Sequence, residues 1–398
     1  MNGPLFPATR SDALSRLAQF VPHAGCAYAA GRNTDPGPDQ QAAVSKLSPY
    51  VRYRLITERE IVAAVLGRHS LQSAEKYVQE VLWRTYWKGW LEMRPSIWTR
   101  FVEERERQRD IFPNARTIAN AEAGLTGIEG FDDWARELIE TGYLHNHARM
   151  WFASIWIFTL RLPWALGADF FMRHLIDADV ASNTLSWRWV AGLQTVGKTY
   201  LATTDNIARY TNGRFAPKGL AQKAFAITET PLPAPQILPG LIPYQPQTPS
   251  LLLVTHEDLN PESLLANDAA VAAAIIMPDA EFLVGERAGK FVSDAAVDTG
   301  ARVSAHFDCR VSILDGLNAD ALISAAQAAG VRQIVTAYAP AGPVADKLTQ
   351  LAALLAQAGI TLLRIRRNWD SSFWPHAKNG FFPFKEAIPS VLREDGIL

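Results

Sequence analysis

A proline-rich segment at residues 231–249 places the strongest constraint on how this chain can fold. It reads PLPAPQILPGLIPYQPQTP and contains seven prolines. Proline fixes φ and removes a backbone donor, so a run this dense neither continues a helix nor pairs inside a sheet. We expect a semi-rigid linker that reaches about 60 Å when fully extended as polyproline II. The chain of 398 residues is long enough for two domains, each with its own core.

The part before the linker has the periodicity of helices. Apolar residues recur there at spacings of three and four, and strand-like alternation is scarce. The helices that this pattern predicts span 11–20, 57–66, 73–92, 96–109, 131–141, 146–160, 168–175 and 178–190. We therefore expect an all-helical domain over residues 1–225.

The part after the linker alternates short apolar runs with helical patterns. Strands are predicted at 251–256, 272–278, 332–340 and 360–366, and helices at 321–330 and 344–359. Such alternation predicts a doubly wound parallel α/β sheet. We expect the linker to occupy 226–250, and an α/β domain with a C-terminal tail to occupy 251–398. No glycine-rich phosphate-binding motif occurs in this part.

Composition and charge narrow the class of protein. The chain is 48% hydrophobic and 20% charged, as globular proteins are. Residues 1–225 carry a net charge of +5 and residues 226–398 a net charge of −6. The helical part therefore suits a polyanion better than the whole-chain charge of −1 suggests. Ten of the twelve tryptophans precede residue 190, which favours a bulky core with a stacking or redox role for a few.

Cysteine usage and hydropathy bound the compartment. Cys26 and Cys309 are the two cysteines, and they lie in no motif. Two cysteines cannot supply a four-cysteine zinc site or an iron–sulfur cluster, and they give no disulfide framework. The N-terminal residues lack the apolar core of a signal peptide, and the apolar segment 148–160 is too short to span a bilayer. We expect no metal site, no membrane association and a cytoplasmic location.

The stretch from Thr141 to Trp189 mixes helix-forming apolar residues with polar and aromatic ones. Asp179, Asn183 and Trp187 follow one another at intervals of four, so on a helix they share one face. A buried carboxylate, amide and indole are costly unless they bind something polar and aromatic. The stretch therefore predicts a buried cofactor with a planar ring system.

Five segments resemble the flavin-binding helical domain of the photolyase and cryptochrome family. They are VSKLSPYVRY (44–53), VQEVLWRTYW (78–87), GLTGIEGFDDWARELIETGYLHN (124–146), LHNHARM (144–150) and LIDADVASNTLSWRW (175–189). They occur in the family's order and with family-like spacing. The second half faintly resembles the α/β domain that this family carries at its N-terminus. The resemblance thus implies a reversed domain order, with an unrelated α/β domain as the alternative.

The resemblance implies non-covalent FAD. In the family, a Ser/Thr-rich turn before a helix cradles the FAD pyrophosphate. Here Val44 replaces the usual Thr of that turn. The implied cofactor-binding residues are Tyr28, Ser45, Lys46, Leu47, Ser48, Arg84, Asn146, Arg149, Asp177, Asp179 and Asn183. Asn183 matches the residue opposite flavin N5, and its neutral amide favours the anionic reduced flavin because an amide cannot deliver a proton as a carboxylic acid could.

The resemblance also implies a pocket for a DNA lesion. The implied substrate-binding residues are Arg32, Glu80, Trp83, His147, Met150 and Trp189. In the family, Glu80's counterpart hydrogen-bonds a pyrimidine base, while the indoles matching Trp83 and Trp189 stack on a flipped dimer. His147 stands where many family members have Arg, which removes a permanent charge. Asn146 and Met150 replace two histidines of the (6-4) enzymes, which favours cyclobutane dimers.

In this family a relay of three tryptophans carries electrons to the flavin. Trp187 and Trp164 match its inner and middle members. Together with Asn183 and Glu80, they are the residues to which the resemblance assigns catalytic roles. The outer member has no match, and Trp98, Trp134, Trp156 or a tyrosine could replace it.

The function that the resemblance implies is light-driven electron transfer from FAD to a cyclobutane pyrimidine dimer in DNA, the reaction of a deoxyribodipyrimidine photo-lyase. A second, unidentified antenna chromophore would lie beside the α/β domain. One alternative is a cryptochrome-like blue-light photoreceptor that binds FAD and signals through a protein partner. Another is a light-independent scaffold or nucleic-acid-binding protein whose flavin pocket is only partly occupied.

Overall fold

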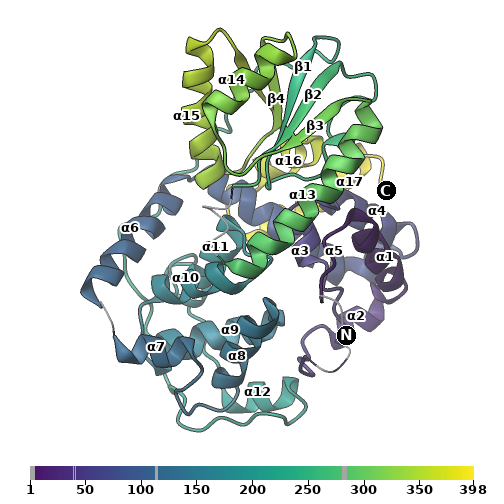
Figure 1. Cartoon of the computed structure of the whole chain (residues 1–398). Helices are drawn as coiled ribbons and strands as arrows, with labels where there is room; N and C mark the ends of the chain where they lie inside the picture. The colour runs from purple at the N-terminus through teal and green to yellow at the C-terminus, as the bar shows by residue number, and fades with distance from the viewer. Residues whose placement is uncertain (1–4, 39, 41, 113–114, 280–284) are drawn as a thin grey trace.

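A computed structural model of the chain describes residues 5–38, 40, 42–112, 115–279 and 285–398. The part before the linker is helical (Figure 1). Its helices are α1 (Arg10–Phe20), α2 (Cys26–Gly31), α3 (Ser48–Arg52), α4 (Glu58–Leu66), α5 (Leu71–Glu92), α6 (Ser96–Ile111), α7 (Arg116–Glu122), α8 (Phe131–Thr141), α9 (Asn146–Ser154), α10 (Trp164–His174), α11 (Val180–Val190) and α12 (Thr204–Tyr210). Each helix predicted in this part is present, and the all-helical assignment is confirmed.

The helix boundaries differ from the predicted ones where local chemistry starts or ends a helix. The predicted helix 146–160 becomes α9 followed by a π-helical turn at Ile155–Thr159. α10 begins directly after Pro163, earlier than predicted, because proline favours the start of a helix. α11 begins at Val180 because the Asp179 side chain accepts from the Ser182 N–H and caps it. The helices that the periodicity missed, α2, α3, α7 and α12, are all shorter than two full turns.

After the linker the chain forms a five-stranded sheet. The strands are β1 (Ser250–Val254), β2 (Val271–Ile276), β3 (Arg310–Ile313), β4 (Gln333–Ala337) and β5 (Thr361–Ile365). All neighbours pair in parallel in the order β3-β2-β1-β4-β5, which confirms the doubly wound prediction. β3 was not predicted because it is an edge strand with largely exposed side chains and no apolar run.

Helices cover both faces of this sheet (Figure 1). They are α13 (Glu286–Phe307), α14 (Ala319–Ala328) and α15 (Pro343–Gln357). Alternate residues of β1 face opposite sides: Leu251 and Leu253 pack with α14 and α15, whereas Leu252 packs with α13. α13 is not among the predicted helices, although its buried residues recur at spacings of three and four.

Residues 367–398, for which the sequence pattern predicts no helix or strand, are folded. They form α16 (Asn368–Phe373), a 3₁₀ turn (Trp374–His376) and α17 (Phe381–Glu394), which pack against α5 of the helical part. The indole N–H of Trp369 donates to Thr85 at 3.0 Å. Trp374 lies so close to α5 that a Cβ added to Gly89 would approach its ring to 2.8 Å. Only glycine therefore fits at that position without a shift of α5 or Trp374.

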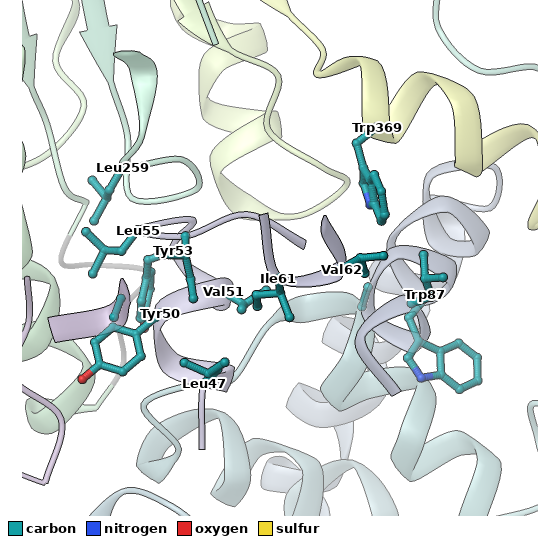
Figure 2. Close-up of a cluster of buried hydrophobic side chains, with 14 of the residues drawn as sticks. Leu47, Tyr50, Val51, Tyr53, Leu55, Ile61, Val62, Trp87, Leu259 and Trp369 are labelled. Atoms are coloured by element: carbon teal, nitrogen blue, oxygen red, sulfur yellow. The ribbon is translucent and has the colours of Figure 1, made fainter. Parts of the chain in front are cut away.

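The two parts of the chain share one continuous core. Figure 2 shows Leu259, from the loop after β1, and Trp369 beside side chains of the N-terminal helices such as Tyr53 and Trp87. Two buried ion pairs cross the same boundary, Arg54–Asp370 at 2.7 Å and Arg52–Glu257 at 2.9 Å. Buried pairs of this kind hold the two parts of the chain in one relative position, since removing one partner would leave an unpaired buried charge.

The proline-rich segment is extended, without helix or strand, as predicted. It runs along the helical part, where the Gln236 N–H donates to the Met93 carbonyl at 2.8 Å and Arg94 donates to the Pro233 carbonyl at 3.1 Å. Among the described residues, no helix is both long and apolar enough to cross a membrane.

Candidate cofactor and substrate site

A cavity in the helical part has a volume of about 620 Å³, within the usual range of small-molecule sites. α2, α5, α9, α11 and the turn before α3 form its walls. The predicted residues that line it are Tyr28, Arg32, Ser45, Lys46, Leu47, Ser48, Glu80, Trp83, Arg84, Asn146, His147, Arg149, Met150, Asp177, Asp179, Asn183, Trp187 and Trp189. The remaining predicted residue, Trp164, lies in the adjoining core. Residues that lie about 150 positions apart in the sequence therefore line the same cavity.

The first fixed charge pair of the cavity joins α5 to the start of α11. Arg84 forms an ion pair with Asp179, whose side chain is only 3% exposed. Burial alone would raise the pKa of Asp179, but the positive charges of Arg84 and Lys88 outweigh it and hold the pKa below its usual value. The carboxylate is therefore charged at neutral pH and has a fixed position.

The second fixed pair joins α9 to the segment before α11. Arg149 donates to Asp177 at 2.8 Å and to the Leu144 carbonyl at 2.9 Å. Burial opposes the charge on Asp177, yet Arg149 lowers the pKa of this carboxyl overall. Each arginine is thereby oriented by a carboxylate that also faces the cavity.

The amide of Asn183 is held from behind. Its Nδ2 donates to the Ala168 carbonyl at 2.9 Å, and the side chain is buried. This bond uses one of the two amide N–H groups and holds the amide in place, and the amide oxygen remains an acceptor for a bound molecule. This orientation agrees with the predicted role of a neutral group that cannot act as an acid.

The cavity wall also contains polar atoms that lack a partner among the described residues. They are the Ser182 hydroxyl and the indole N–H of Trp187, and both are buried. Unpaired buried donors are costly, so they favour a ligand with acceptor atoms at this depth. Beside the turn that precedes α3, burial lowers the pKa of Lys46, and Arg16 adds to the effect. These donors, the two ion pairs and the apolar wall at Leu47 fit a large, partly charged cofactor with a planar ring, as FAD is.

The outer rim of the cavity is built around Glu80. Its carboxylate accepts from Arg32 at 3.1 Å and from Asn146 at 3.3 Å. Burial raises the pKa of Glu80, and Arg32 partly opposes this. The resemblance implies that Arg32 binds the substrate, but in this structure Arg32 pairs with Glu80, the carboxylate expected to hydrogen-bond a base.

The two predicted stacking indoles have aromatic neighbours. Phe381 lies face to face on Trp83, with ring centroids 3.7 Å apart and planes 10° apart. Trp189 stacks on Tyr200 at 5.6 Å. Phe382 also lines the cavity. The sequence analysis does not identify either phenylalanine as a site residue, although both belong to the aromatic run FFPF at 381–384.

His147 sits at the rim as a neutral group. Burial and the neighbouring His145 lower the pKa of His147 to about 4. Its ring packs against Trp151 at 5.4 Å and Tyr210 at 5.5 Å. The position thus supplies apolar contact in place of the charge that an arginine would bring.

Two groups of aromatic side chains lie in the core behind the cavity. Trp156 lies 6.3 Å from Trp187 but is completely buried. Phe101 connects Trp164, at 5.7 Å, with the half-buried Trp98, at 5.4 Å. Trp98 therefore reaches solvent, which Trp156 and the fully buried Trp134 do not.

A second cavity lies near the carboxyl end of β1, between Arg52, His256 and Glu257, and has a volume of about 20 Å³. This volume has room for about one water molecule and is too small for a pigment. Among the described residues, no group of three or more His, Cys, Asp and Glu is arranged to hold a metal ion.

Fold and site together define a helical cofactor-binding domain packed on a parallel α/β domain. Residues 77–218 match the model of the FAD binding domain of DNA photolyase. Two curated relatives are deoxyribodipyrimidine photo-lyases. The one from Streptomyces griseus is 34% identical over 38% of this chain and 33% of its own length. The one from Alkalihalophilus pseudofirmus is 29% identical over 47% of this chain and 39% of its own length.

The chain thus spans roughly a third to two fifths of the length of these relatives. Among solved structures, a class III photolyase from Agrobacterium tumefaciens is 27% identical, with a TM-score of 0.41 over 51% of this chain and 44% of that one. A cryptochrome from Synechocystis is 25% identical, with a TM-score of 0.43 over 52% and 44%. The helical part of this chain is therefore similar to the FAD binding domain of DNA photolyase.

Proposed function

We propose that the chain is a deoxyribodipyrimidine photo-lyase, which splits cyclobutane pyrimidine dimers in DNA under blue light. The observation that carries the proposal is the convergence of the implied cofactor and lesion residues on one cavity. The photo-lyases from Streptomyces griseus and Alkalihalophilus pseudofirmus are 34% and 29% identical to this chain over 38% and 47% of its length. Bound FAD would supply light absorption and the electron for splitting, which the protein side chains cannot do.

The inner residues bind and orient the cofactor in this proposal. Arg84 and Arg149 present fixed positive charge, each anchored by a buried carboxylate. Ser45 and Ser48 offer hydroxyls for phosphate oxygens. Asn183 offers an acceptor and no acidic proton, so it leaves an anionic ring unprotonated.

The outer residues receive the lesion. Trp83 and Trp189 give two aromatic walls, and stacking of this kind substitutes for lost base pairing when a lesion is flipped out. Glu80 accepts hydrogen bonds from a base once Arg32 and Asn146 release its carboxylate. Met150 adds apolar contact to the same wall.

Several finer assignments belong to the same proposal. We place the domain boundaries at 1–225, 226–250 and 251–398. The free cysteines Cys26 and Cys309 fit a reducing cytoplasm. An antenna chromophore is also part of the proposal, although the cavity near β1 is too small for one.

The decisive experiment is repair of a thymine-dimer duplex by chemically reduced protein under blue light, with a dark control. Chemical reduction bypasses the tryptophan relay, so the assay tests the cavity alone. We expect light-dependent splitting, and we expect Glu80→Gln to lower repair at subsaturating DNA while it retains FAD. A protein that binds FAD, bleaches under light and splits no dimer contradicts the proposal.

One observation favours a cryptochrome-like photoreceptor as the second candidate. The carboxylate of Glu80 is already engaged by Arg32 and Asn146, so the group meant for the base is not free. Photoreduction without repair would then be the result, together with light-dependent binding of a protein partner. A colourless protein that cannot be reconstituted with FAD would instead indicate a light-independent scaffold.

A further inference from the structure

One element of the C-terminal part reaches the cavity. The lining residues among the described part of the chain come from positions 28–190, with the exception of Phe382 on the first turn of α17. The side chain of Phe382 is 80% exposed, whereas that of Phe381 beside it is buried. A large apolar side chain with this exposure at the mouth of a cavity is a typical binding feature.

The backbone that carries Phe382 is held from both sides. On one side, Tyr86 donates to the Asn379 carbonyl at 2.8 Å and Arg94 donates to the Lys378 carbonyl at 2.7 Å. On the other side, Phe384 is fully buried and packs on Tyr86 at 5.4 Å. The exposed ring thus projects from a fixed support, so ordering it against a ligand costs little entropy.

The neighbours of Phe382 indicate which ligand it suits. Phe381 stacks on Trp83, so the exposed ring continues the aromatic wall that the proposed lesion would meet. Lys378 is exposed four residues earlier, and the helical part carries a net charge of +5. An aromatic platform next to positive charge is the combination that binds single-stranded nucleic acid, since bases stack and phosphates pair with cations.

We propose that Phe382 is a substrate-contact residue that stacks on an unpaired base next to the dimer in the damaged strand. This inference rests on the proposed function. It assigns the C-terminal helix α17 a role in binding DNA. The substrate-binding residues that the resemblance implies all lie in the helical part. We expect the ring of Phe382 to contact a nucleobase. This ring extends the aromatic wall at Trp83, and it lies at the mouth of the cavity, away from the charged residues of the inner end.

The test measures binding in the dark, where no dimer is split. The variants are Phe382→Ala and Phe382→Trp, and the matched control is Phe225→Ala. Phe225 is 79% exposed but does not line the cavity. We expect Phe382→Ala to weaken binding of a dimer-containing duplex about tenfold, the size of one lost base stack. Phe382→Trp restores the affinity, and Phe225→Ala leaves it unchanged.

A second measurement reports the stack itself. With 2-aminopurine placed on either side of the dimer, stacking on Phe382 quenches its fluorescence in the complex. Phe382→Ala should restore emission at one of the two positions at saturating protein, and a purely structural role would not. FAD content, read from visible absorbance, stays equal in all variants.

Failure of the inference is distinguishable from failure of the proposed function. If the wild type prefers dimer-containing DNA and Phe382→Ala binds it equally well, only the role of Phe382 is wrong. If Phe382→Ala loses FAD, the ring covers the cofactor and the inference is overturned. If the wild type shows no preference for the dimer, both are wrong.

Discussion

The inner end and the outer rim of the cavity use the same residue types in opposite ways. At the inner end, Asp179 is 3% exposed and pairs with Arg84. At the rim, Glu80 is 34% exposed and pairs with Arg32, which is 32% exposed. Burial lets the inner pair hold a fixed geometry, while solvent weakens the outer pair and makes it exchangeable.

This difference matches what the two ends would bind. A resident cofactor requires charges that are already in place, because reorganisation would reduce its affinity. A DNA lesion comes and goes, so the rim needs partners that open without a large cost. The same contrast separates Phe381, buried against Trp83, from the exposed Phe382 beside it.

The largest expected effect comes from breaking the inner pair with Asp179→Ala. This change leaves Arg84 as an unpaired buried cation and removes the cap of α11. We expect a loss of about 3–5 kcal/mol in the free energy of unfolding, together with loss of FAD. Urea denaturation and visible absorbance measure the two effects.

Asp294→Ala is the control for this substitution. It breaks an exposed pair with Lys290 on α13 and should cost less than about 1 kcal/mol. Equal losses in the two variants would show that burial does not distinguish the inner end.

The next effect concerns the buried histidine behind the rim. Burial lowers the pKa of His145 to about 4, with Asp35 opposing and Arg149 adding to the shift. A histidine with a depressed folded-state pKa contributes stability that is present above its unfolded value near 6.5 and lost as the pH falls towards 4. We expect wild type to lose on the order of 2–3 kcal/mol across that window.

His145→Asn should remove the share of this pH dependence that belongs to His145, because the amide keeps an acceptor for the His147 N–H but does not titrate. The shares of His147, His174 and His256, whose pKa values burial also lowers to about 4, should remain. Denaturation at pH 7 and pH 4.5 measures the difference. The same change at the exposed His376 is the control and should leave the slope in place. A slope in His145→Asn as steep as that of the wild type would show that His145 does not contribute to it.

The inner end of the cavity and the parallel sheet are the features that the sequence predicts best. Inner-end residues such as Asp177 and Asn183 sit within contiguous motifs, so spacing and resemblance together identify them. The parallel sheet follows from alternating strand and helix patterns, and edge strand β3 is missed because its exposed residues carry no apolar signal.

The rim depends on packing between distant segments, which sequence patterns do not encode. Nothing local in the sequence indicates that Phe381 lies on Trp83, about 300 positions earlier, or that Arg32 binds Glu80. The sequence pattern predicts no helix over residues 367–398, because short aromatic-rich helices lack a full apolar repeat. Their order comes from burial of Trp369 and Trp374 against α5.

A third prediction follows the aromatic core outward from the inner end. If electrons reach the cavity through Trp164 and Trp98, Trp164→Phe and Trp98→Phe should each slow photoreduction about tenfold or more, a change of about 1.4 kcal/mol in barrier. Both variants should repair dimers normally after chemical reduction. Visible absorbance under continuous blue light gives the rate.

Trp134→Phe is the matched control, since Trp134 is buried and stacks on Trp151 away from the cavity. Slowing by Trp134→Phe alone would place the route on the other side of the core. No change in Trp98→Phe would exclude Trp98 as the outer member.

The smallest effect is expected at the rim pair. Burial raises the folded-state pKa of Glu80, so its contribution to stability is present below the unfolded value near 4.5 and is lost as the pH rises through the folded-state pKa. The glutamine of the Glu80→Gln variant does not titrate. The free energy of unfolding of this variant should therefore increase relative to wild type as the pH rises over that window. Because both partners are about a third exposed, we expect the gain to stay below about 1 kcal/mol.

Arg32→Gln should lower stability by a similarly small amount at pH 7, since it removes the cation that opposes the shift. Urea midpoints of both variants between pH 4.5 and pH 7 measure these changes, and a loss as large as that of Asp179→Ala would show that the rim is as rigid as the inner end.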